Sequence, residues 1–504
     1  MQQASNTSQI KTASTSTAEN IPYDLIVIGS GIAGLSAAVA AADCGASVVV
    51  LERSPEADFG GNTRWTESYF RMKSETEVSD DFEERLVSNA GFHLDPNIIE
   101  AASAPYADWP PYVKAHGMPD PEIVSTLAEG AGPTVAWLKS FGIRFDFLPT
   151  YFVTAAAPRL MPVGGGLAMI EALRTYALKK GVTCLYETTA RSLQRRTERA
   201  GEQTAVQLTI TDRVGIERVL QGKNIVIASG GFQGNPEMLT QYLGQAAKFV
   251  RPVAKGGYYN KGEGIRMALN AGAAPAGDFS SYHAEPLDPR SGATEALVMN
   301  FTYGILVNKF GERFLNEAPG PVDVNYDHIS RAIGEQPDGI CYVIFDQRIH
   351  DVPNWKKSIR TDMPAFEGST LTELAIACGL PAKDLERTVQ AFNESCPSGA
   401  GFKPLEIDGL ATQGLKIPKS HWSRPIDQGP FMAYPIIPGI CFTYGGIKIN
   451  SSSQVVDQDG RPIPGLYAAG EATGLYHQVY TGATSVMRGA VFGKIAGEHA
   501  MRGE

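Results

Sequence analysis

The chain lacks cysteines at the short spacings that bind metals, attach haem or form redox disulfides. No CxxC, CxxCH or CxxxxC pair occurs among its six cysteines, which are Cys44, Cys184, Cys341, Cys378, Cys396 and Cys441. This pattern excludes the usual local signatures of those sites, and we expect no bound metal. Scattered thiols suit a reducing compartment, which favours a cytoplasmic protein.

Excess positive charge and long apolar runs are also missing. The 504 residues carry a net charge of −10, which leaves no basic excess to meet the phosphates of a nucleic acid. No apolar run reaches the roughly 18 residues that a membrane span needs. Residues 1–20 are rich in Ser, Thr, Gln and Asn and lack the apolar core of a secretory signal, so we expect a disordered tail there.

A glycine-rich turn is the clearest feature that is present. Residues 24–34 read DLIVIGSGIAG and, after a helix-like run, residues 48–52 read VVVLE. This order predicts strand, turn, helix and second strand, the βαβ unit that binds a dinucleotide. Gly29 permits the turn, Gly31 lets the backbone approach a pyrophosphate, and Gly34 lets helix and strand pack closely. Glu52 then stands where a carboxylate meets a ribose hydroxyl.

Other segments indicate a larger α/β fold. Residues 223–231 and 464–471 each read as an apolar strand that ends in glycine, and residues 60–63 read GGNT. A glycine loop precedes an amphipathic helix at 167–177, and residues 181–190 read as a strand. Strands that alternate with helices are typical of a largely parallel, doubly wound sheet.

The composition of the chain changes beyond about residue 285. Proline and glycine become frequent, and helix-like pieces occur at 370–377 and 382–392. Distant segments that return to one cofactor fit a dinucleotide-binding domain interrupted by a second domain. We expect its parts at 21–285 and 437–504, with a smaller substrate-capping domain at 286–436.

Seven segments carry a family resemblance, and they lie at 27–34, 60–63, 228–231, 310–317, 443–446, 465–471 and 491–497. Together they resemble the flavoprotein subunits of fumarate reductase and succinate dehydrogenase. The pattern is closest to the soluble relatives tricarballylate dehydrogenase and 3-ketosteroid Δ1-dehydrogenase. The resemblance implies a Rossmann-like FAD-binding domain, with non-covalent FAD, interrupted by an α+β substrate-capping domain.

The resemblance also implies a set of FAD contacts. Glu52 resembles the ribose ligand, Ala190 a contact near the adenine, and Glu471 one near the ribitol. Ser485 would open a final helix whose positive end faces the flavin. The full implied set is Gly29, Gly31, Ala33, Gly34, Glu52, Arg53, Gly61, Asn62, Thr63, Ala190, Gly230, Gly231, Gly470, Glu471, Ser485 and Val486.

This sequence departs from the dicarboxylate enzymes at the substrate site. Tyr480 falls where they have a carboxylate-binding Arg, and residues 441–446 read CFTYGG where they have a histidine-containing segment. After Asn316 and Glu317, the segment APGPVD replaces one that holds a relay Arg. A guanidinium matches a carboxylate, whereas a phenol donates one neutral hydrogen bond, better suited to a carbonyl or an enolate.

These departures favour desaturation next to a carbonyl or carboxylate, by α-proton removal and β-hydride transfer to flavin N5. The substrate would be a cyclic ketone, of oxo-cycloalkane or ketosteroid type, or a tricarballylate-like acid. The candidate catalytic residues are Tyr480, Tyr444 and Tyr326, the last either a facing base or a packing residue. The candidate substrate contacts are His283, Glu285, Arg159 and Thr443, although the favoured alternative for Arg159 is a solvated or salt-bridged side chain.

The sequence leaves the electron acceptor and the direction open. Only one GxGxxG occurs, so NAD(P)H is not expected as a direct partner, and oxygen, a quinone or an electron-transfer protein remain. One alternative function is a fumarate reductase-type enoate reductase. Another is a non-catalytic flavin-binding sensor or scaffold, against which the retained segment 310–317 argues mildly.

Overall fold

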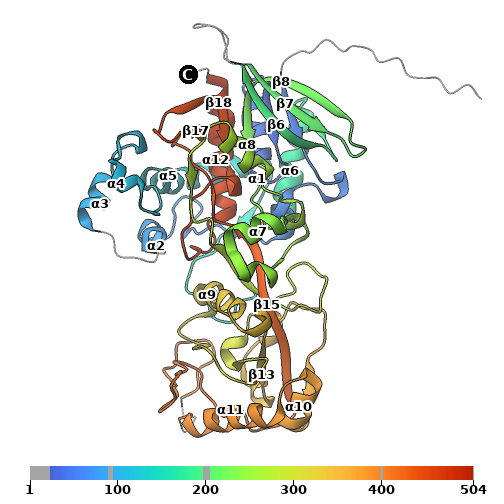
Figure 1. Cartoon of the computed structure of the whole chain (residues 1–504), viewed down its shortest axis with the longest axis vertical. Coiled ribbons are helices and arrows are strands. Elements are labelled where there is room, and N and C mark those ends of the chain that lie inside the picture. Colours follow the sequence, from blue (N-terminus) through green and yellow to red (C-terminus); the bar gives the residue numbers. More distant parts are fainter. Residues whose placement is uncertain (1–22, 89–94, 197–204, 398–400, 503–504) are drawn as a thin grey trace, which may run out of the picture.

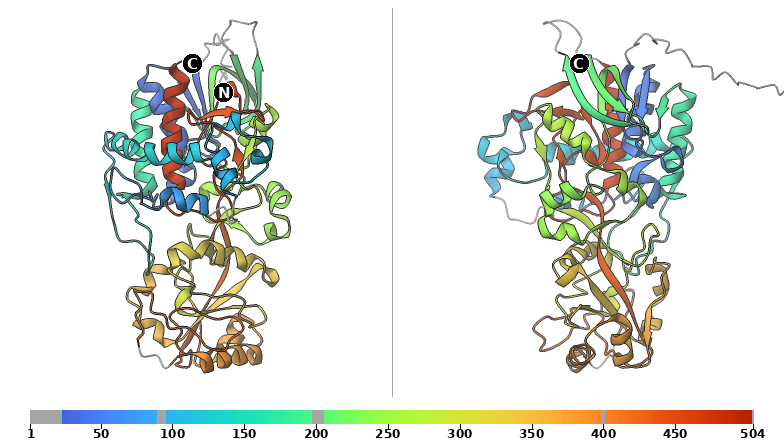
Figure 2. Two further views of the ribbon diagram at one scale, coloured as in Figure 1. Left: turned by 90° about the vertical axis from the view of Figure 1, so that its left-hand side faces the viewer. Right: turned by 45° about the vertical axis from the view of Figure 1, so that its right-hand side comes forward.

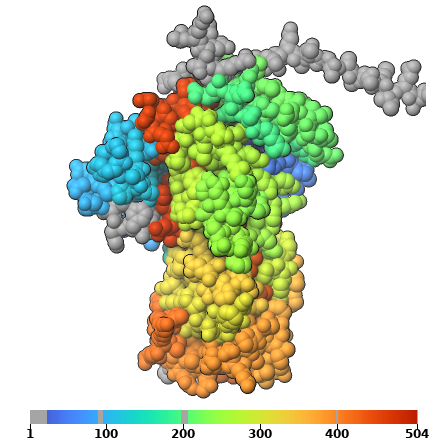
Figure 3. Space-filling model, in the orientation of Figure 1, coloured from blue at the N-terminus to red at the C-terminus, as the bar shows by residue number. Residues whose placement is uncertain are grey.

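The computed structural model describes residues 23–88, 95–196, 205–397 and 401–502, so the tail expected at 1–20 lies outside the described residues. The chain forms two lobes, an upper one on an eight-stranded sheet and a lower one on a six-stranded sheet (Figure 1). Figure 3 shows the lower lobe, in yellow and orange, continuing from the upper one. Among the described residues, no helix has the length and apolar character to cross a bilayer.

The eight-stranded sheet contains the predicted βαβ unit. Strand β1 (Tyr23–Ile28) lies between β2 (Val48–Leu51) and β8 (Glu217–Ile227), and the three run parallel. The strand order is β17 (Gln454–Val456), β18 (Pro462–Ala468), β8, β1, β2 and β5 (Thr183–Leu185). In addition, β7 (Ala205–Thr211) pairs with β8, and β6 (Thr189–Arg196) pairs with β7. β18 is parallel to β8, as expected, although β6, β7 and β17 pair antiparallel. The predicted α/β fold class is confirmed.

The single strand expected at 181–190 is wrong, because the structure has two strands there. β5 pairs with β2, whereas β6 pairs with β7. Between them, Glu187 has a φ of 49°, a left-handed conformation that interrupts an extended chain. The N–H of Thr188 donates to the carbonyl of Glu52 at 2.9 Å, so the turn is anchored at the end of β2.

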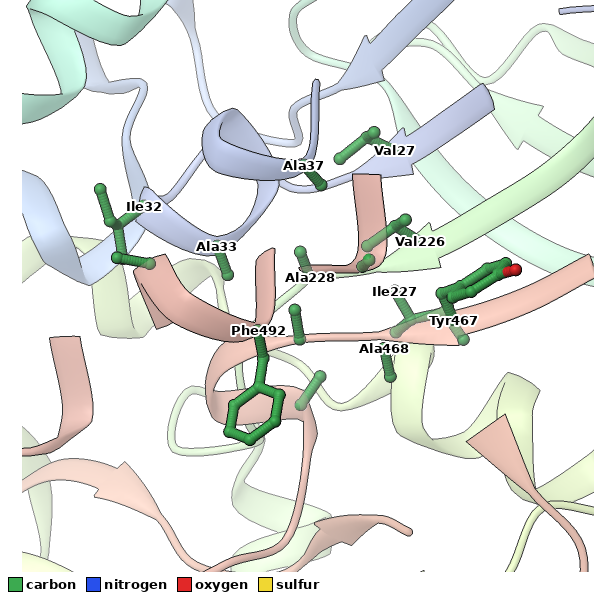
Figure 4. Close-up of a cluster of buried hydrophobic side chains, with 14 of the residues drawn as sticks. Val27, Ile32, Ala33, Ala37, Val226, Ile227, Ala228, Tyr467, Ala468 and Phe492 are labelled. Atoms are coloured by element: carbon green, nitrogen blue, oxygen red, sulfur yellow. The ribbon is translucent and has the colours of Figure 1, made fainter. Parts of the chain in front are cut away.

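Helix α12 (Ser485–Arg502) packs along α1 (Ile32–Asp43) because glycines line the contact. A Cβ at Gly493 would lie 2.3 Å from the carbonyl oxygen of Ala33, and one at Gly497 would lie 2.3 Å from that of Ala37. Figure 2 shows the two helices side by side, and Figure 4 shows the apolar side chains that they bury with β8 and β18. The first turn of α12 is thereby held near the glycine turn before α1.

The lower lobe is arranged around a long central strand. The sheet order is β11 (Tyr282–Leu287), β15 (Phe431–Thr443), β13 (Cys341–Phe345) and β12 (Ile305–Asn308), with β9 (Arg251–Pro252) and β14 (Phe366–Gly368) also paired to β15. Helix α9 (Val322–Gly334) packs on β11 and β15. β15 runs from the lower lobe to the upper one (Figure 1), so β11 and β15 both cross the domain boundaries expected from sequence.

The remaining elements complete the two lobes. Helices α10 (Leu371–Cys378) and α11 (Ala382–Ser395) confirm two predicted helices of the lower lobe, and α6 (Gly165–Lys179) contains the helix predicted at 167–177. The other helices are α2 (Phe82–Ser88), α3 (Pro96–Ala101), α4 (Pro111–Lys114), α5 (Pro121–Lys139), α7 (Pro236–Leu243) and α8 (Glu263–Asn270). The short strands are β3 (Phe145–Asp146), β4 (Met161–Pro162), β10 (Pro275–Ala276) and β16 (Gly446–Ile447).

Candidate active site

One long cavity runs from the glycine turn of the upper lobe to strands β11 and β15. Its lining contains most of the residues singled out in the sequence: Gly29, Gly31, Ala33, Glu52, Arg53, Gly61, Asn62, Thr63, Arg159, Ala190, Gly230, His283, Glu285, Tyr326, Gly470, Glu471, Tyr480, Ser485 and Val486. Four others, Gly34, Gly231, Thr443 and Tyr444, lie outside that lining. The fold therefore brings both ends of the chain and its middle to one site.

The glycine turn has the close packing that the motif predicts. Gly29 has a φ of 108°, and a Cβ there would lie 2.3 Å from the carbonyl oxygen of Ala228. A Cβ at Gly34 would lie 1.9 Å from the carbonyl oxygen of Gly29, so this glycine packs helix against strand instead of lining the cavity. The nearest atoms to a Cβ at Gly31 would be the Gly60 carbonyl oxygen and the Thr63 hydroxyl, each at 3.7 Å, and Gly31 lines the cavity.

Glu52 is held at the end of β2 by three hydrogen bonds. Its carboxylate accepts from the Ser30 N–H at 3.1 Å, the Ser30 hydroxyl at 2.5 Å and the Ser54 N–H at 2.7 Å. The residue is 7% exposed and lines the cavity, which leaves lone pairs for a hydroxyl donor. Arg53, beside it, pairs with Glu263 at 2.5 Å.

The middle of the cavity contains polar atoms that the protein leaves unsatisfied. Within the described part of the chain, the Asn62 Oδ1, the Ser229 hydroxyl and the Nε and Nη2 of Arg488 are buried without a hydrogen-bond partner. All three residues line the cavity. Arg488 also donates from Nη1 to the Thr473 carbonyl at 3.1 Å. Together with the glycine turn and Glu52, this arrangement fits the phosphates, ribose and polar ring edge of FAD.

Glu471 anchors a polar cluster beside this region. It accepts from the Thr443 N–H at 3.1 Å, from Gln233 Nε2 at 3.3 Å and from Asn260 Nδ2 at 3.2 Å. Burial raises the pKa of its carboxyl to about 7. A Cβ at Gly231 would lie 2.0 Å from the Thr443 hydroxyl and 2.4 Å from Glu471, which places Gly231 and Thr443 behind the cavity wall.

Tyr480 lies at the N-terminus of α12. Its hydroxyl oxygen accepts from the Thr484 N–H at 3.0 Å and the Ser485 N–H at 3.1 Å, and its O–H donates to the Ser485 hydroxyl at 3.0 Å. Free N–H groups at a helix start carry partial positive charge. A substrate oxygen at this point would therefore meet a phenol and a helix N-terminus together.

His283 and Tyr326 form a buried pair facing Tyr480. His283 Nε2 lies 2.8 Å from the Tyr326 hydroxyl, and the His283 ring centroid lies 4.3 Å from that of Tyr480. Burial lowers the pKa of His283 to about 3, so its ring is neutral, and burial also holds the pKa of Tyr326 well above its usual range. The pair is thus two neutral groups that share a hydrogen bond.

Arg159 forms a buried ion pair through Nη2, while its Nε has no hydrogen-bond partner. Its Nη2 donates to the Asp323 carboxylate at 3.1 Å, and the two side chains are 4% and 0% exposed. Asp323 also accepts from the Ala156 and Ala157 N–H groups at 3.0 and 3.2 Å. The salt-bridged alternative for Arg159 therefore describes the structure, although the residue still lines the cavity.

Tyr444 is separated from the cavity by other aromatic side chains. It is fully buried, with ring centroids 5.6 Å from Tyr476 and 5.7 Å from Phe442, and Phe442 supplies the cavity lining. The side chain expected beside Tyr480 thus packs behind it. Phe442 instead contacts Tyr480, at a centroid distance of 5.0 Å.

Several residues of this end were missed by sequence reasoning. They are Glu67, Tyr69, Tyr151, Phe152, Glu295 and Cys441, all of which line the cavity. Arg360 joins two of them, because it donates to Glu67 and to Glu295 at 2.6 Å each. These residues come from distant segments without a shared spacing, so no local motif signals them. Of these residues, only Cys441 could have been found from sequence, because it is the first residue of the CFTYGG segment.

Comparison with known proteins shows the family. The model of the family described as FAD binding domain matches residues 24–486. The chain is 27% identical to the vinyl phenol reductase of Lactiplantibacillus plantarum, and the match covers 92% of each protein. It is 26% identical to the 4-oxocyclohexanecarboxylate 2-dehydrogenase of Sinomonas cyclohexanicum, and that match covers 92% of this chain and 90% of the relative. It also matches an open flavocytochrome c3 fumarate reductase structure, with a TM-score of 0.70, 25% identity, and coverage of 95% and 78%. The resemblance inferred from motifs is confirmed.

Proposed function

The chain belongs to the FAD-binding flavoprotein family matched over residues 24–486, and from that premise we propose that it desaturates a carbon–carbon bond next to a carbonyl. Its cofactor is FAD, and it is an oxidoreductase acting on CH–CH groups. The substrate is a small molecule, and the electron acceptor is oxygen, a quinone or an electron-transfer protein. The finer assignment rests on the chemistry of the cavity end that faces Tyr480.

The observation that carries the proposal is the hydroxyl of Tyr480 at the start of α12. The Tyr480 O–H donates to Ser485 Oγ in this structure and would turn from it to a carbonyl oxygen placed there, which also meets the field of the helix N-terminus. Both stabilise the negative charge that grows on the oxygen as the α-proton leaves. This acidifies the α carbon through a neutral donor and a helix N-terminus at the carbonyl oxygen.

The facing pair supplies the other half of the reaction. His283 contacts the ring of Tyr480 and is hydrogen-bonded to Tyr326, and we assign this pair to take up the α-proton. Bound FAD supplies the acceptor for the β-hydride. The substrate loses one proton and one hydride and gains one double bond, so atoms and electrons balance.

The lining favours a ketone over an acid. The charge of Arg159 is already balanced by Asp323 through Nη2, so a substrate carboxylate gains less from this guanidinium than from an unpaired one, although its Nε has no hydrogen-bond partner. The walls at this end include Tyr69, Tyr151 and Phe152, which suit the faces of a ring. A cyclic ketone is therefore the substrate class we propose first, before a tricarballylate-like acid.

A second candidate is the reverse reaction, reduction of a conjugated double bond. The similarity to a vinyl phenol reductase over 92% of both chains favours it. The same groups would serve, with the Tyr326–His283 pair delivering a proton. The two directions differ in which substrate oxidation state exchanges electrons with the flavin.

An anaerobic titration separates these functions. Holoenzyme is mixed with 4-oxocyclohexanecarboxylate, androst-4-ene-3,17-dione or tricarballylate, and the oxidised-flavin absorbance is followed. We expect a ketone to bleach the flavin and to yield a product lighter by two hydrogens. If none of these three compounds bleaches it but a conjugated alkene such as a vinyl phenol reoxidises the reduced enzyme, the protein is a reductase. If neither occurs, it is a flavin-binding sensor or scaffold.

A further inference from the structure

Glu285 is a buried carboxylate that faces the cavity without an ion pair. It is 7% exposed and lines the cavity. Within the described ranges it has no salt bridge and no backbone hydrogen bond, and its side-chain partner is the Cys441 thiol. A buried carboxylate with so little compensation costs stability, so its retention in this cavity points to a role in binding or chemistry.

The strand geometry places Glu285 beside the Tyr326–His283 pair. His283 and Glu285 are two residues apart on β11, so their side chains leave the same face of the strand. A ring nitrogen of His283, a carboxylate oxygen of Glu285 and the Cys441 sulfur all lie within 4.8 Å of one another. One bridging water or a small side-chain rotation closes a gap of that size.

The pair itself cannot retain the proton that it takes from a substrate. Burial lowers the pKa of His283 to about 3, and it holds the pKa of Tyr326 well above its usual range. An imidazolium in this site would lose its proton at once, and a resting tyrosinate would not form. The two groups can therefore pass a proton on, and a nearby group must store it.

We propose that the Glu285 carboxylate is the proton acceptor of the desaturation, reached from the substrate through Tyr326 and His283. The α C–H bond breaks and its proton goes to the Tyr326 oxygen. The Tyr326 proton moves to His283 Nε2, and the proton on the other ring nitrogen moves to Glu285. Tyr326 and His283 end neutral and Glu285 ends protonated. This inference rests on the proposed function.

The charges around Glu285 suit this role. Burial raises the pKa of its carboxyl to about 7, so it is ionised above that pH and able to accept a proton. The nearby carboxylates of Glu67 and Asp327 also raise the pKa of Glu285, whereas Arg360 and the Cys441 thiol lower it. The other groups that face it are His283, Tyr151, Glu295 and Tyr326.

The first test is the pH profile of flavin reduction by a saturating ketone in stopped flow. In the wild-type enzyme the rate should rise through a pH of about 7 and then level off. Glu285→Gln should reduce the rate on the order of 100-fold and abolish that rise. Glu285→Asp should restore the rise at a lower rate. Glu312→Gln, the same change at an exposed site of the lower lobe, should leave the profile unchanged.

The second test uses Cys441→Ala, which keeps Glu285 in place. The thiol hydrogen bond favours the ionised carboxylate, so its loss should move the pH midpoint of the rate to a higher value. A wild-type profile without a midpoint near neutrality would overturn the proposal. So would an unmoved midpoint in Cys441→Ala, or a Glu285→Gln enzyme that keeps the wild-type rate and profile.

The outcomes separate this inference from the proposed function. If no ketone reduces the wild-type flavin, the proposed desaturation itself fails. If a ketone reduces the wild-type flavin but the rate and its pH profile are unchanged in Glu285→Gln and Cys441→Ala, the desaturation stands and Glu285 is not the proton acceptor. Should Glu285→Gln not fold, the shift in Cys441→Ala decides the question.

Discussion

The two ends of the cavity are built in opposite ways. The dinucleotide end comes largely from the first βαβ unit, where Gly29, Gly34 and Glu52 lie within one short stretch of chain. The substrate end is assembled from β11, α9, β15 and the start of α12, which are far apart in sequence. Local backbone geometry therefore shapes the first end, and tertiary packing shapes the second. Substitutions at the two ends should therefore impair different properties, namely FAD binding at the first end and stability or flavin reduction at the second.

The largest effect is expected at the glycine turn. Gly34→Val places side-chain atoms where the Gly29 carbonyl oxygen lies, 1.9 Å from the Cβ position, so α1 cannot approach β1. We expect purified protein without bound FAD, measured as the flavin-to-protein absorbance ratio. Gly292→Val, at a glycine with no atom within 4 Å of its Cβ position, is the control. Full flavin content in Gly34→Val would contradict the role of this glycine.

The next effect should be a loss of stability at the substrate end. Asp323→Ala leaves the buried Arg159 guanidinium without its carboxylate, at a cost of about 3 kcal/mol in the free energy of unfolding by urea. FAD content should hold, because the dinucleotide end is untouched. Arg387→Ala breaks the surface pair with Asp384 in the same lobe and should cost under about 1 kcal/mol. Equal losses of unfolding free energy in the two variants would show that the buried ion pair contributes no more than the surface pair.

Tyr480→Phe should affect chemistry while folding and cofactor stay intact. Removal of the hydroxyl should slow flavin reduction on the order of 100-fold, since the developing oxyanion loses its donor. Tyr476→Phe is a matched control, because that hydroxyl contacts Thr484 at 2.7 Å and its side chain does not line the cavity. An unchanged rate in Tyr480→Phe would remove Tyr480 from the mechanism.

The smallest effect is expected for Glu52→Gln. The amide keeps the shape of the side chain but loses the charge that accepts a ribose hydroxyl, and it meets two N–H donors with one acceptor oxygen. FAD binding should weaken about tenfold, which corresponds to roughly 1.4 kcal/mol, by fluorescence titration of the apoprotein. Flavin reduction at saturating FAD should not change. A slower reduction would mean that the two ends are coupled.

Much of the upper lobe could be predicted because its signals are local. The turn at Gly29, the packing glycine Gly34 and the parallel return of β18 follow from strand and turn chemistry. The strand expected at 181–190 was wrong because Glu187 turns the chain toward another partner, which no periodicity reveals. Tyr444 lies behind Phe442 and Tyr476 because packing, not spacing, decides which aromatic side chain reaches a cavity.

The sequence by itself determined the cofactor and the family, because a glycine turn and a following acid specify backbone geometry within one βαβ unit. It also identified Tyr480, Tyr326, His283 and Glu285 as candidates. Only the tertiary structure decided that they lie together. Burial makes His283 neutral, a helix start meets the Tyr480 hydroxyl, and β11 places Glu285 beside the pair. Burial and proximity across distant segments are properties of the packed chain, so they set the chemistry that the sequence could only suggest.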